Sequence, residues 1–187
     1  MKTALFGGTF DPVHNGHLAI ASAAVVQGKL DRVVFVPCFE SPHKSGVKSA
    51  DAAHRFAMLK LATADLPWAE VSDWEIQRET PSYSWQTAQH FSAEDTELFW
   101  ILGADQWVAL ERWSKPEVLA ALLKFIVFPR DDIELAPKEG FQATFLETRH
   151  PASATEIRRL QGVSPHLAAP VSSYIKQHAL YSDVRPH

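Results

Sequence analysis

The chain has 187 residues, of which 46% are hydrophobic and 21% charged, the balance of an ordinary globular protein. This length suits one domain, so we expect residues 1–187 to form a single unit around one core. The formal net charge of -4 argues against the broad basic face that nucleic-acid binding needs. No apolar stretch approaches the roughly 18 residues of a membrane span, and the N-terminal apolar run is too short for a signal peptide. We therefore expect a cytoplasmic protein without a membrane partner, and the single cysteine, Cys38, excludes an intramolecular disulfide.

Short apolar runs alternate with helical patterns along the chain. Runs rich in Val, Ile and Phe predict strands, and the stretches between them predict helices. The strands are expected at residues 3–6, 32–37, 70–75, 97–103, 124–129 and 144–147. The helices are expected at residues 16–27, 52–64, 84–91, 104–112, 116–123, 154–160 and 171–178. Asp51 is the expected cap of the second helix, and Ser114 with Pro116 is expected to open the fifth.

This alternation predicts an α/β fold, a doubly wound and mostly parallel sheet with helices on both faces. Two of the predicted strands lack polar alternation, which is typical of strands that are covered on both faces. Ligands of such sheets bind at the carboxyl ends of the strands. The segments that follow the strands are therefore the candidates for a functional site.

The loop after the first strand has the sequence GGTFDPVHNGH, residues 7–17. Its paired glycines, Gly7 and Gly8, let the backbone turn sharply and approach a ligand closely. The helix that follows has free N–H groups at its start, which suit an anion such as a triphosphate. His14 and His17 lie three residues apart on one side of the first turn, where protonated imidazoles can donate to phosphate oxygens. Taken alone, such a pair also fits solvated surface histidines or part of a zinc site.

A second polar segment, SATEIRR, occupies residues 153–159. Ser153 or Thr155 can cap a helix there, and Glu156 completes the spacing of a capping box. The same residues place hydroxyl groups at the start of a helix and Arg158 one turn further on. A guanidinium offers a planar fork of donors that matches phosphate, so the residues alone allow either a capped helix or a phosphate site.

The segment GGTFDPVHNGH resembles the signature of the nucleotidyltransferase superfamily whose motif ends in His-x-Gly-His. The resemblance extends over most of the chain, and the family it implies is that of the bacterial nicotinate mononucleotide adenylyltransferases. It implies that His14 and His17 contact the triphosphate of ATP and that His17 stabilises the pentavalent phosphorus during transfer. The residues that it assigns to ATP in this loop are Gly7, Gly8, Thr9, Phe10, His14 and His17.

The segment SATEIRR is similar to the Ile-Ser-Ser-Thr-x-x-Arg motif of this family, which favours adenylyl over cytidylyl transfer. Ser153, Thr155 and Arg158 match the motif, and the resemblance implies that they bind phosphates, with Arg158 also catalytic. Ala154 stands where the family has a second serine, so this sequence lacks one hydroxyl of the motif, while the placement of the arginine is kept. The segment at residues 103–105 matches Gly-x-Asp, which places Gly103 and Asp105 near the ATP adenosine, although Asp105 alone also fits a helix cap.

Three further segments resemble the substrate side of the family. Residues 41–44, Ser-Pro-His-Lys, are similar to Pro-Pro-His-Lys, and residues 83–87 to Tyr-Thr-x-Asp-Thr, with Gln86 in place of the acid. Trp113 matches Leu-x-x-Trp and could stack on a pyridine ring, although core packing is the commoner fate of tryptophan. Ser84 alone fits a helix cap. The substrate-binding residues implied are His43, Lys44, Tyr83, Ser84 and Trp113.

The resemblance implies transfer of AMP from ATP to nicotinate mononucleotide, giving nicotinate adenine dinucleotide and pyrophosphate in NAD biosynthesis. Nicotinamide mononucleotide and phosphopantetheine are the alternative acceptors, and an ATP-binding sensor without turnover is the alternative from another class. Mg²⁺ is expected to arrive with the ATP phosphates, because no cluster of carboxylates suggests a metal site of the protein's own. The sequence leaves the oligomeric state open. Residues 174–181 resemble the terminal helix of the family, which implies a role in packing and not in chemistry.

Overall fold

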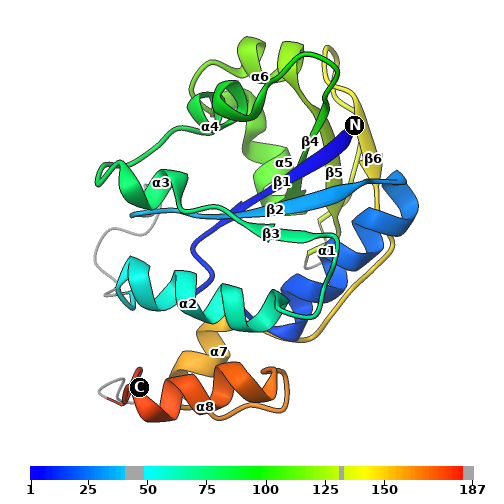
Figure 1. Cartoon of the computed structure of the whole chain (residues 1–187). Helices are drawn as coiled ribbons and strands as arrows, with labels where there is room; N and C mark the ends of the chain where they lie inside the picture. Colours follow the sequence, from blue (N-terminus) through cyan, green and yellow to red (C-terminus); the bar gives the residue numbers. More distant parts are fainter. Residues whose placement is uncertain (41–48, 131–132, 183–187) are drawn as a thin grey trace.

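The computed structural model describes residues 1–40, 49–130 and 133–182, and it contains one parallel sheet (Figure 1). The strands run in the spatial order β3-β2-β1-β4-β5-β6, and every neighbouring pair is parallel. The strand order reverses between β1 and β4, which is where ligands bind in sheets of this kind. The strands are β1 (Lys2–Gly8), β2 (Arg32–Pro37), β3 (Ala69–Val71), β4 (Glu97–Gly103), β5 (Lys124–Phe128) and β6 (Ala143–Phe145).

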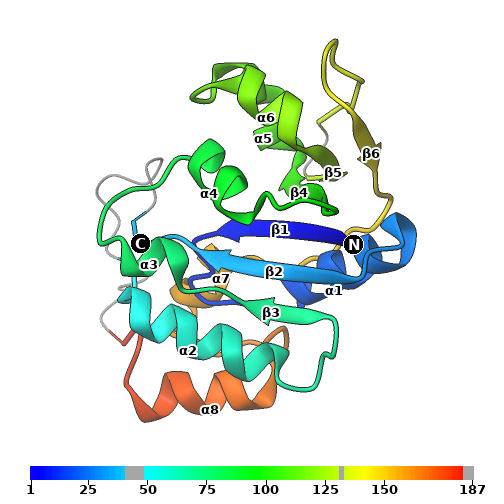
Figure 2. The same ribbon diagram turned by 45° about the horizontal axis from the view of Figure 1, so that its top comes forward.

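Helices cover both faces of the sheet, as the sequence predicts (Figure 2). The side of α1 and α2 also carries α7 and α8, whereas α4, α5 and α6 cover the other side. The helices are α1 (Asn15–Gly28), α2 (Ala52–Thr63), α3 (Trp74–Gln77), α4 (Ser84–Phe91), α5 (Ala104–Ala109), the 3-10 helix η1 (Leu110–Arg112), α6 (Pro116–Leu122), α7 (Ala154–Arg159) and α8 (Ala169–Gln177).

Two hydrophobic cores lie on the two faces, and alternate residues of the same strand enter each core. In β2, Val33 and Phe35 pack toward α1 and α2, whereas Val34 and Val36 belong to the other core. This follows from the pleat, which points successive side chains to opposite faces. Because both faces are covered, each central strand is apolar throughout, and the continuous runs in the sequence correspond to these strands.

The expectation of a strand at residues 70–75 is wrong in its second half. β3 ends at Val71, and the backbone N–H of Trp74 donates to the Ser72 hydroxyl (3.2 Å) at the start of α3. This local bond competes with strand pairing, as serine side chains commonly do. Glu75 therefore lies in a helix, where its buried carboxylate accepts a hydrogen bond from the Thr87 hydroxyl (2.6 Å). Burial raises the pKa of Glu75 above its ordinary value of 4.5.

Smaller corrections concern the helix ends. The helix expected at residues 104–112 divides into α5 and η1, and Lys115, in a left-handed conformation (φ 53°), takes the capping position of α6 in place of Ser114. Asp51 does precede α2, but its side chain makes no capping bond among the described residues. The remaining helices and strands begin and end within two residues of the predicted bounds.

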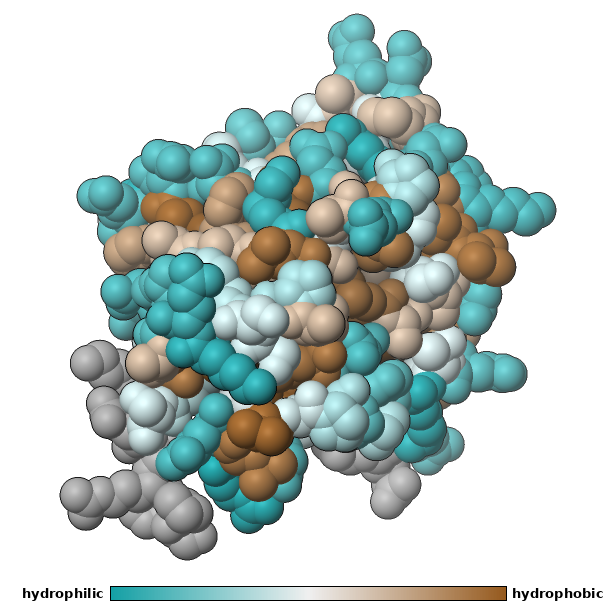
Figure 3. Space-filling view, turned by 60° about the horizontal axis from the view of Figure 1, so that its bottom comes forward, coloured by the Kyte–Doolittle hydropathy of each residue, from teal (hydrophilic) through white to brown (hydrophobic). Residues whose placement is uncertain are grey.

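On the face seen in Figure 3, apolar side chains lie in several patches that are separated by polar side chains. Large exposed hydrophobic side chains are spread over separate elements, with Val26 on α1, Leu61 on α2 and Val108 on α5. Among the described residues, none of the helices has the length and apolar character needed to cross a membrane.

Replacing Glu75 with glutamine tests the buried carboxylate. Glu75→Gln keeps the shape of the side chain and an acceptor for Thr87 but removes the ionisable group. The pKa of Glu75 is higher in the folded chain than in the unfolded chain, so wild-type stability falls as pH rises from the unfolded pKa through the folded one. We expect the melting temperature of the variant, relative to wild type, to rise as the pH increases above 4.5, the ordinary pKa of a glutamate.

Thermal unfolding followed by circular dichroism at several pH values measures this difference. Glu94→Gln, at an exposed position, is the matched control and should show no such trend. Parallel pH profiles of Glu75→Gln and wild type would contradict the assignment.

Candidate active site

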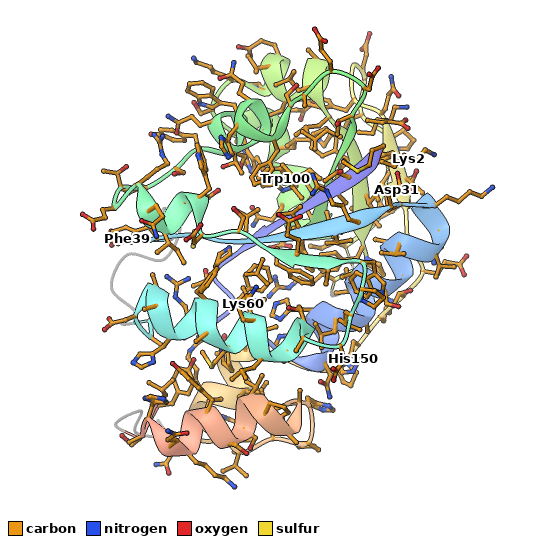
Figure 4. The ribbon with its side chains drawn as sticks, viewed as in Figure 1. Lys2, Asp31, Phe39, Lys60, Trp100 and His150 are labelled. Atoms are coloured by element: carbon orange, nitrogen blue, oxygen red, sulfur yellow. The ribbon has the colours of Figure 1, made fainter. Side chains whose placement is uncertain are left out.

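The loop between β1 and α1 leaves the sheet at the carboxyl end of β1, where the strand order reverses. Gly7 and Gly8 are the last two residues of β1, and neither has a positive φ. Both positions suit glycine because they leave little room for a side chain. A Cβ on Gly7 would lie 2.8 Å from Cζ2 of Trp100, and one on Gly8 would lie 3.2 Å from the Phe10 ring. The expected role of the glycines in a sharp turn is therefore wrong. Figure 4 labels Trp100 beside β1 at the centre of the sheet.

Phe10, and not a glycine, adopts the left-handed backbone conformation in this loop (φ 50°). Its ring is buried among aromatic rings, with centroids 5.5 Å from Phe6, 5.8 Å from Phe35 and 5.0 Å from His17. A residue with a Cβ in this conformation costs roughly 1–2 kcal/mol, and such strain persists only where the surroundings hold it. The packing of the Phe10 ring therefore holds this residue in its left-handed conformation.

His14 and His17 are brought together at the start of α1, as the sequence predicts. His14 occupies the capping position, and the two rings stack with centroids 3.7 Å apart. The backbone N–H of His14 donates to Nδ1 of His17 (3.2 Å). With Nδ1 accepting, we assign the proton of a neutral His17 to Nε2, which is a donor suited to a phosphate oxygen.

His14 differs from expectation in its charge. Burial, followed by the neighbouring imidazoles of His150 and His166, lowers the pKa of His14 to about 4. The ring is therefore neutral near pH 7, and the expected protonated imidazole at this position is wrong. Nδ1 of His14 is buried and has no hydrogen-bond partner among the described residues. His14 thus orders the first turn of α1 and adds no positive charge.

The two polar segments at opposite ends of the chain meet in space. Nη1 of Arg158 donates to the backbone carbonyl of Asp11, across 147 residues of sequence, and lies 3.8 Å from its carboxylate. Nη2 donates to the Thr155 hydroxyl (3.3 Å), and the side chain is only 12% exposed. Ser153 caps α7 by accepting from the N–H of Glu156 (3.4 Å). The helix cap and the placement of the arginine therefore occur together.

Asp11 is a residue that sequence reasoning missed. Its carboxylate is 3% exposed and accepts from the N–H of Ala50 (3.2 Å) and from the hydroxyl of Tyr181 (2.7 Å). Burial and the charge of Asp11 raise the pKa of Tyr181, so this hydroxyl keeps its proton. Tyr181 lies in the segment expected to serve packing and not chemistry, and its hydroxyl holds the Asp11 carboxylate in place. The place of Asp11 inside the motif was the one available signal.

Asp105 follows the carboxyl end of β4, beside the end of β1. Gly103 takes the capping position of α5, so a cap role for Asp105 is wrong. One oxygen of Asp105 accepts from Gln106 (3.2 Å) and lies 3.5 Å from Nη1 of Arg130. The other oxygen is buried without a partner in the described part of the chain. A Cβ on Gly103 would lie 2.7 Å from this oxygen, so the glycine gives it room.

The structure describes three of the five residues that were expected to bind the substrate, namely Tyr83, Ser84 and Trp113. His43 and Lys44 lie outside the described residues. Tyr83 is exposed and takes the capping position of α4, so the cap role expected for Ser84 is wrong. Gln86, which replaces the acid of the family motif, accepts from the N–H of Tyr83 through its side-chain carbonyl (2.9 Å). That carbonyl is therefore already engaged within the chain.

Trp113 follows η1 and is half-buried, with its ring 6.5 Å from that of Trp100 at an interplanar angle of 81°. Trp100 in turn lies against Gly7 at the end of β1. The indole of Trp113 is thus connected to the loop of the N-terminal motif through one aromatic contact.

The parallel sheet, the loop after β1 and the arginine brought to it from α7 define a nucleotidyltransferase. The chain belongs to the cytidylyltransferase-like family, whose model matches residues 5–160.

Individual relatives agree on a narrower group. A probable nicotinate-nucleotide adenylyltransferase from Neisseria meningitidis serogroup C is 39% identical, over 96% of this chain and 98% of the relative. One from Methylacidiphilum infernorum is 38% identical, over 96% and 92%. The structure of Plasmodium falciparum nicotinic acid mononucleotide adenylyltransferase complexed with NaAD has a TM-score of 0.78 at 16% identity, over 97% of both chains, and shows the same fold.

Arg158→Lys tests the arginine of the C-terminal motif. An ammonium has one nitrogen and cannot reproduce the planar fork that contacts Asp11 and Thr155 on two sides. We expect ATP to bind about 10-fold to 10²-fold more weakly, the range for a lost hydrogen bond to a charged group. Titration calorimetry with ATP and magnesium measures the change.

The neighbouring Arg159, which is exposed and paired with Glu156 (2.8 Å), provides the matched control Arg159→Lys. Equal ATP affinities in the two variants would show that Arg158 serves only the helix.

Proposed function

We propose that the protein transfers the AMP group of ATP to nicotinate mononucleotide, forming nicotinate adenine dinucleotide and releasing pyrophosphate. The observation that carries this proposal is the meeting of Arg158 with the loop that contains His14 and His17. Relatives named as nicotinate-nucleotide adenylyltransferases over nearly the whole chain support the choice of substrates.

The reaction needs no nucleophile from the protein. A phosphate oxygen of the mononucleotide attacks the α-phosphorus of ATP in line, and the bond from that phosphorus to the bridging oxygen breaks as pyrophosphate leaves. Catalysis of such transfers rests on positioning and on the neutralisation of phosphate charge. His17 donates from Nε2 to the reacting phosphate, and Arg158 with Ser153 and Thr155 holds the phosphates that leave.

Magnesium enters as part of the ATP substrate. In residues 1–40, 49–130 and 133–182, no group of three or more His, Cys, Asp or Glu side chains is arranged to hold a metal ion. The site offers mainly N–H and O–H donors, which suit phosphate oxygens better than a hard cation. Mg²⁺ bound to the phosphates reduces their charge, and the protein side chains supply the remaining contacts.

The adenosine of ATP is assigned to the ends of β1 and β4. Gly7, Gly8, Thr9 and Phe10 form one side of this position, and Gly103 with Asp105 forms the other. The unpartnered oxygen of Asp105 is an acceptor for a nucleoside hydroxyl or amine. On the acceptor side, we assign His43 and Lys44 to the phosphate of the mononucleotide and Trp113 to its pyridine ring.

The choice of nicotinate follows from the polar groups near α4. The Ser84 hydroxyl and backbone N–H groups can donate to a carboxylate, whereas the amide of nicotinamide would meet them with its own NH₂. An amide would need an acceptor, and the Gln86 carbonyl is engaged by the N–H of Tyr83. This arrangement favours the carboxylate.

His17→Ala should lower turnover by ~10²–10³-fold while ATP affinity stays within a few-fold, because it removes one donor to the transition state. Steady-state kinetics and a separate ATP-binding measurement on the same preparation distinguish the two effects. His90→Ala, which removes an exposed imidazole stacked on Trp74 (4.5 Å), should retain turnover. A folded His17→Ala protein with wild-type turnover would remove His17 from the mechanism.

Pyrophosphate release across a panel of acceptors tests the proposed substrate. With nicotinate mononucleotide, nicotinamide mononucleotide and phosphopantetheine, we expect kcat/KM to favour the first by at least ~10²-fold. Equal values for the two mononucleotides would end the claim of nicotinate specificity and leave adenylyl transfer standing. Binding of ATP without pyrophosphate release from any acceptor would identify a sensor instead.

A further inference from the structure

Arg55, in the first turn of α2, is a buried cation that the proposed reaction does not use. Its side chain is 2% exposed, and all three of its nitrogens donate to backbone carbonyls. Nε donates to Ala50 (2.9 Å), Nη1 to Thr9 (2.8 Å) and Nη2 to Phe39 (2.8 Å). Figure 4 labels Phe39 just past the end of β2, near the start of α2.

Burying a guanidinium costs free energy unless its N–H groups find hydrogen-bond acceptors. The three backbone carbonyls supply these acceptors. Among the described residues, no carboxylate forms an ion pair with Arg55. The N–H groups of its planar guanidinium donate to three backbone carbonyls that lie on different sides of the plane's edge. An apolar side chain of the same volume would leave three buried carbonyls without these donors. Arg55 therefore joins three backbone segments at one point.

One of these segments is the β1–α1 loop. Phe10 holds its left-handed conformation between two anchored neighbours, because Arg55 holds the carbonyl of Thr9 before it. On the other side, Asp11 accepts from the N–H of Ala50, and Ala50 in turn accepts from Arg55. The loop is thus tied to Arg55 twice, once directly at Thr9 and once through Ala50.

The same anchored segment reaches the phosphate-binding groups. Asp11 receives the Arg158 guanidinium on its carbonyl and the Tyr181 hydroxyl on its carboxylate. The loop then enters α1 at the stacked pair His14 and His17. A shift in the backbone around Phe10 would therefore move both the histidines and the arginine, which must face the same triphosphate.

We propose that Arg55 is a positioning residue, which sets the course of the β1–α1 loop so that His17 and Arg158 meet the phosphates of one ATP. The assignment of those phosphates rests on the proposed function. Arg55 touches neither substrate and acts through the carbonyls of Thr9, Phe39 and Ala50. A single ammonium cannot replace it, because a lysine nitrogen cannot reach three carbonyls that lie around a planar fork.

The test compares Arg55→Lys and Arg55→Met with wild type in two measurements. The first is the rise in melting temperature on adding ATP and magnesium, and the second is kcat and KM for ATP under saturating acceptor. We expect both variants to fold, to lose most of the ATP-induced rise and to turn over about 10-fold to 10²-fold more slowly, the effect of a small misplacement. A role in stability alone would lower the melting temperature but leave kcat per folded molecule unchanged.

Thr63→Val is the matched control, since Thr63 is also polar and buried on α2 but its hydroxyl donates within its own helix, to the Leu59 carbonyl (2.9 Å). It should destabilise the fold and leave kcat and the ATP response intact. If Arg55→Met does not fold, Arg55→Lys and Arg55→Gln, which keep a donor, provide the same comparison.

A wild-type ATP response and wild-type kcat in any folded Arg55 variant would overturn the proposal. If Arg55→Lys is the variant that behaves as wild type, a positive charge at this position is sufficient and the planar fork is not needed. The ATP response needs no acceptor, so it tests Arg55 even if nicotinate mononucleotide proves to be the wrong substrate. Failure of wild type to release pyrophosphate with nicotinate mononucleotide would instead count against the proposed function.

Discussion

The candidate site depends on the buried carboxyl group and backbone of Asp11. One residue receives the hydroxyl of Tyr181, the N–H of Ala50 and the guanidinium of Arg158. A buried carboxylate is stable only when donors surround it, so these contacts hold four segments of the chain in one arrangement. Asp11 thus connects the N-terminal loop to the C-terminal segments that carry Arg158 and Tyr181.

The sheet supplies the frame for this junction. Because β1 and β4 are parallel neighbours at the reversal of strand order, the segments that follow them open on the same edge. Both strands are buried on two faces, which makes the edge rigid, and α7 packs into the same core as α1 and α2. Strain at Phe10 can be held here because its ring is buried and packed against the rings of Phe6, Phe35 and His17.

Much of the fold could be predicted from the sequence, because covered parallel strands leave continuous apolar runs such as that of β4. The N-terminal motif and the arginine near the C-terminus could also be found, since chemistry at a strand end has a short sequence signature. What could not be predicted depends on contacts between distant segments. The neutral state of the His14 imidazole follows from its burial beside His150 and His166, which belong to a distant segment. Two donors to the Asp11 carboxylate, Ala50 and Tyr181, lie 39 and 170 positions further along the chain.

The local errors have a similar origin. Glu75 follows a run of apolar and polar residues that fits a strand, and only the bonds at Ser72 and Thr87 turn it into a buried helical position. Gly7 and Gly8 look like turn glycines, yet their neighbours Trp100 and Phe10 explain them. In both places, packing against a segment distant in sequence, or a side-chain bond, decides the structure over local propensity.

The stereochemistry of the transfer is the most direct test of the account. With an ATP analogue made chiral by sulfur at the α-phosphorus, direct attack by the mononucleotide phosphate inverts the configuration once. We expect nicotinate adenine dinucleotide with inverted configuration, which phosphorus NMR can assign. Retention would reveal a covalent intermediate on the protein, and the absence of dinucleotide would contradict adenylyl transfer to this acceptor.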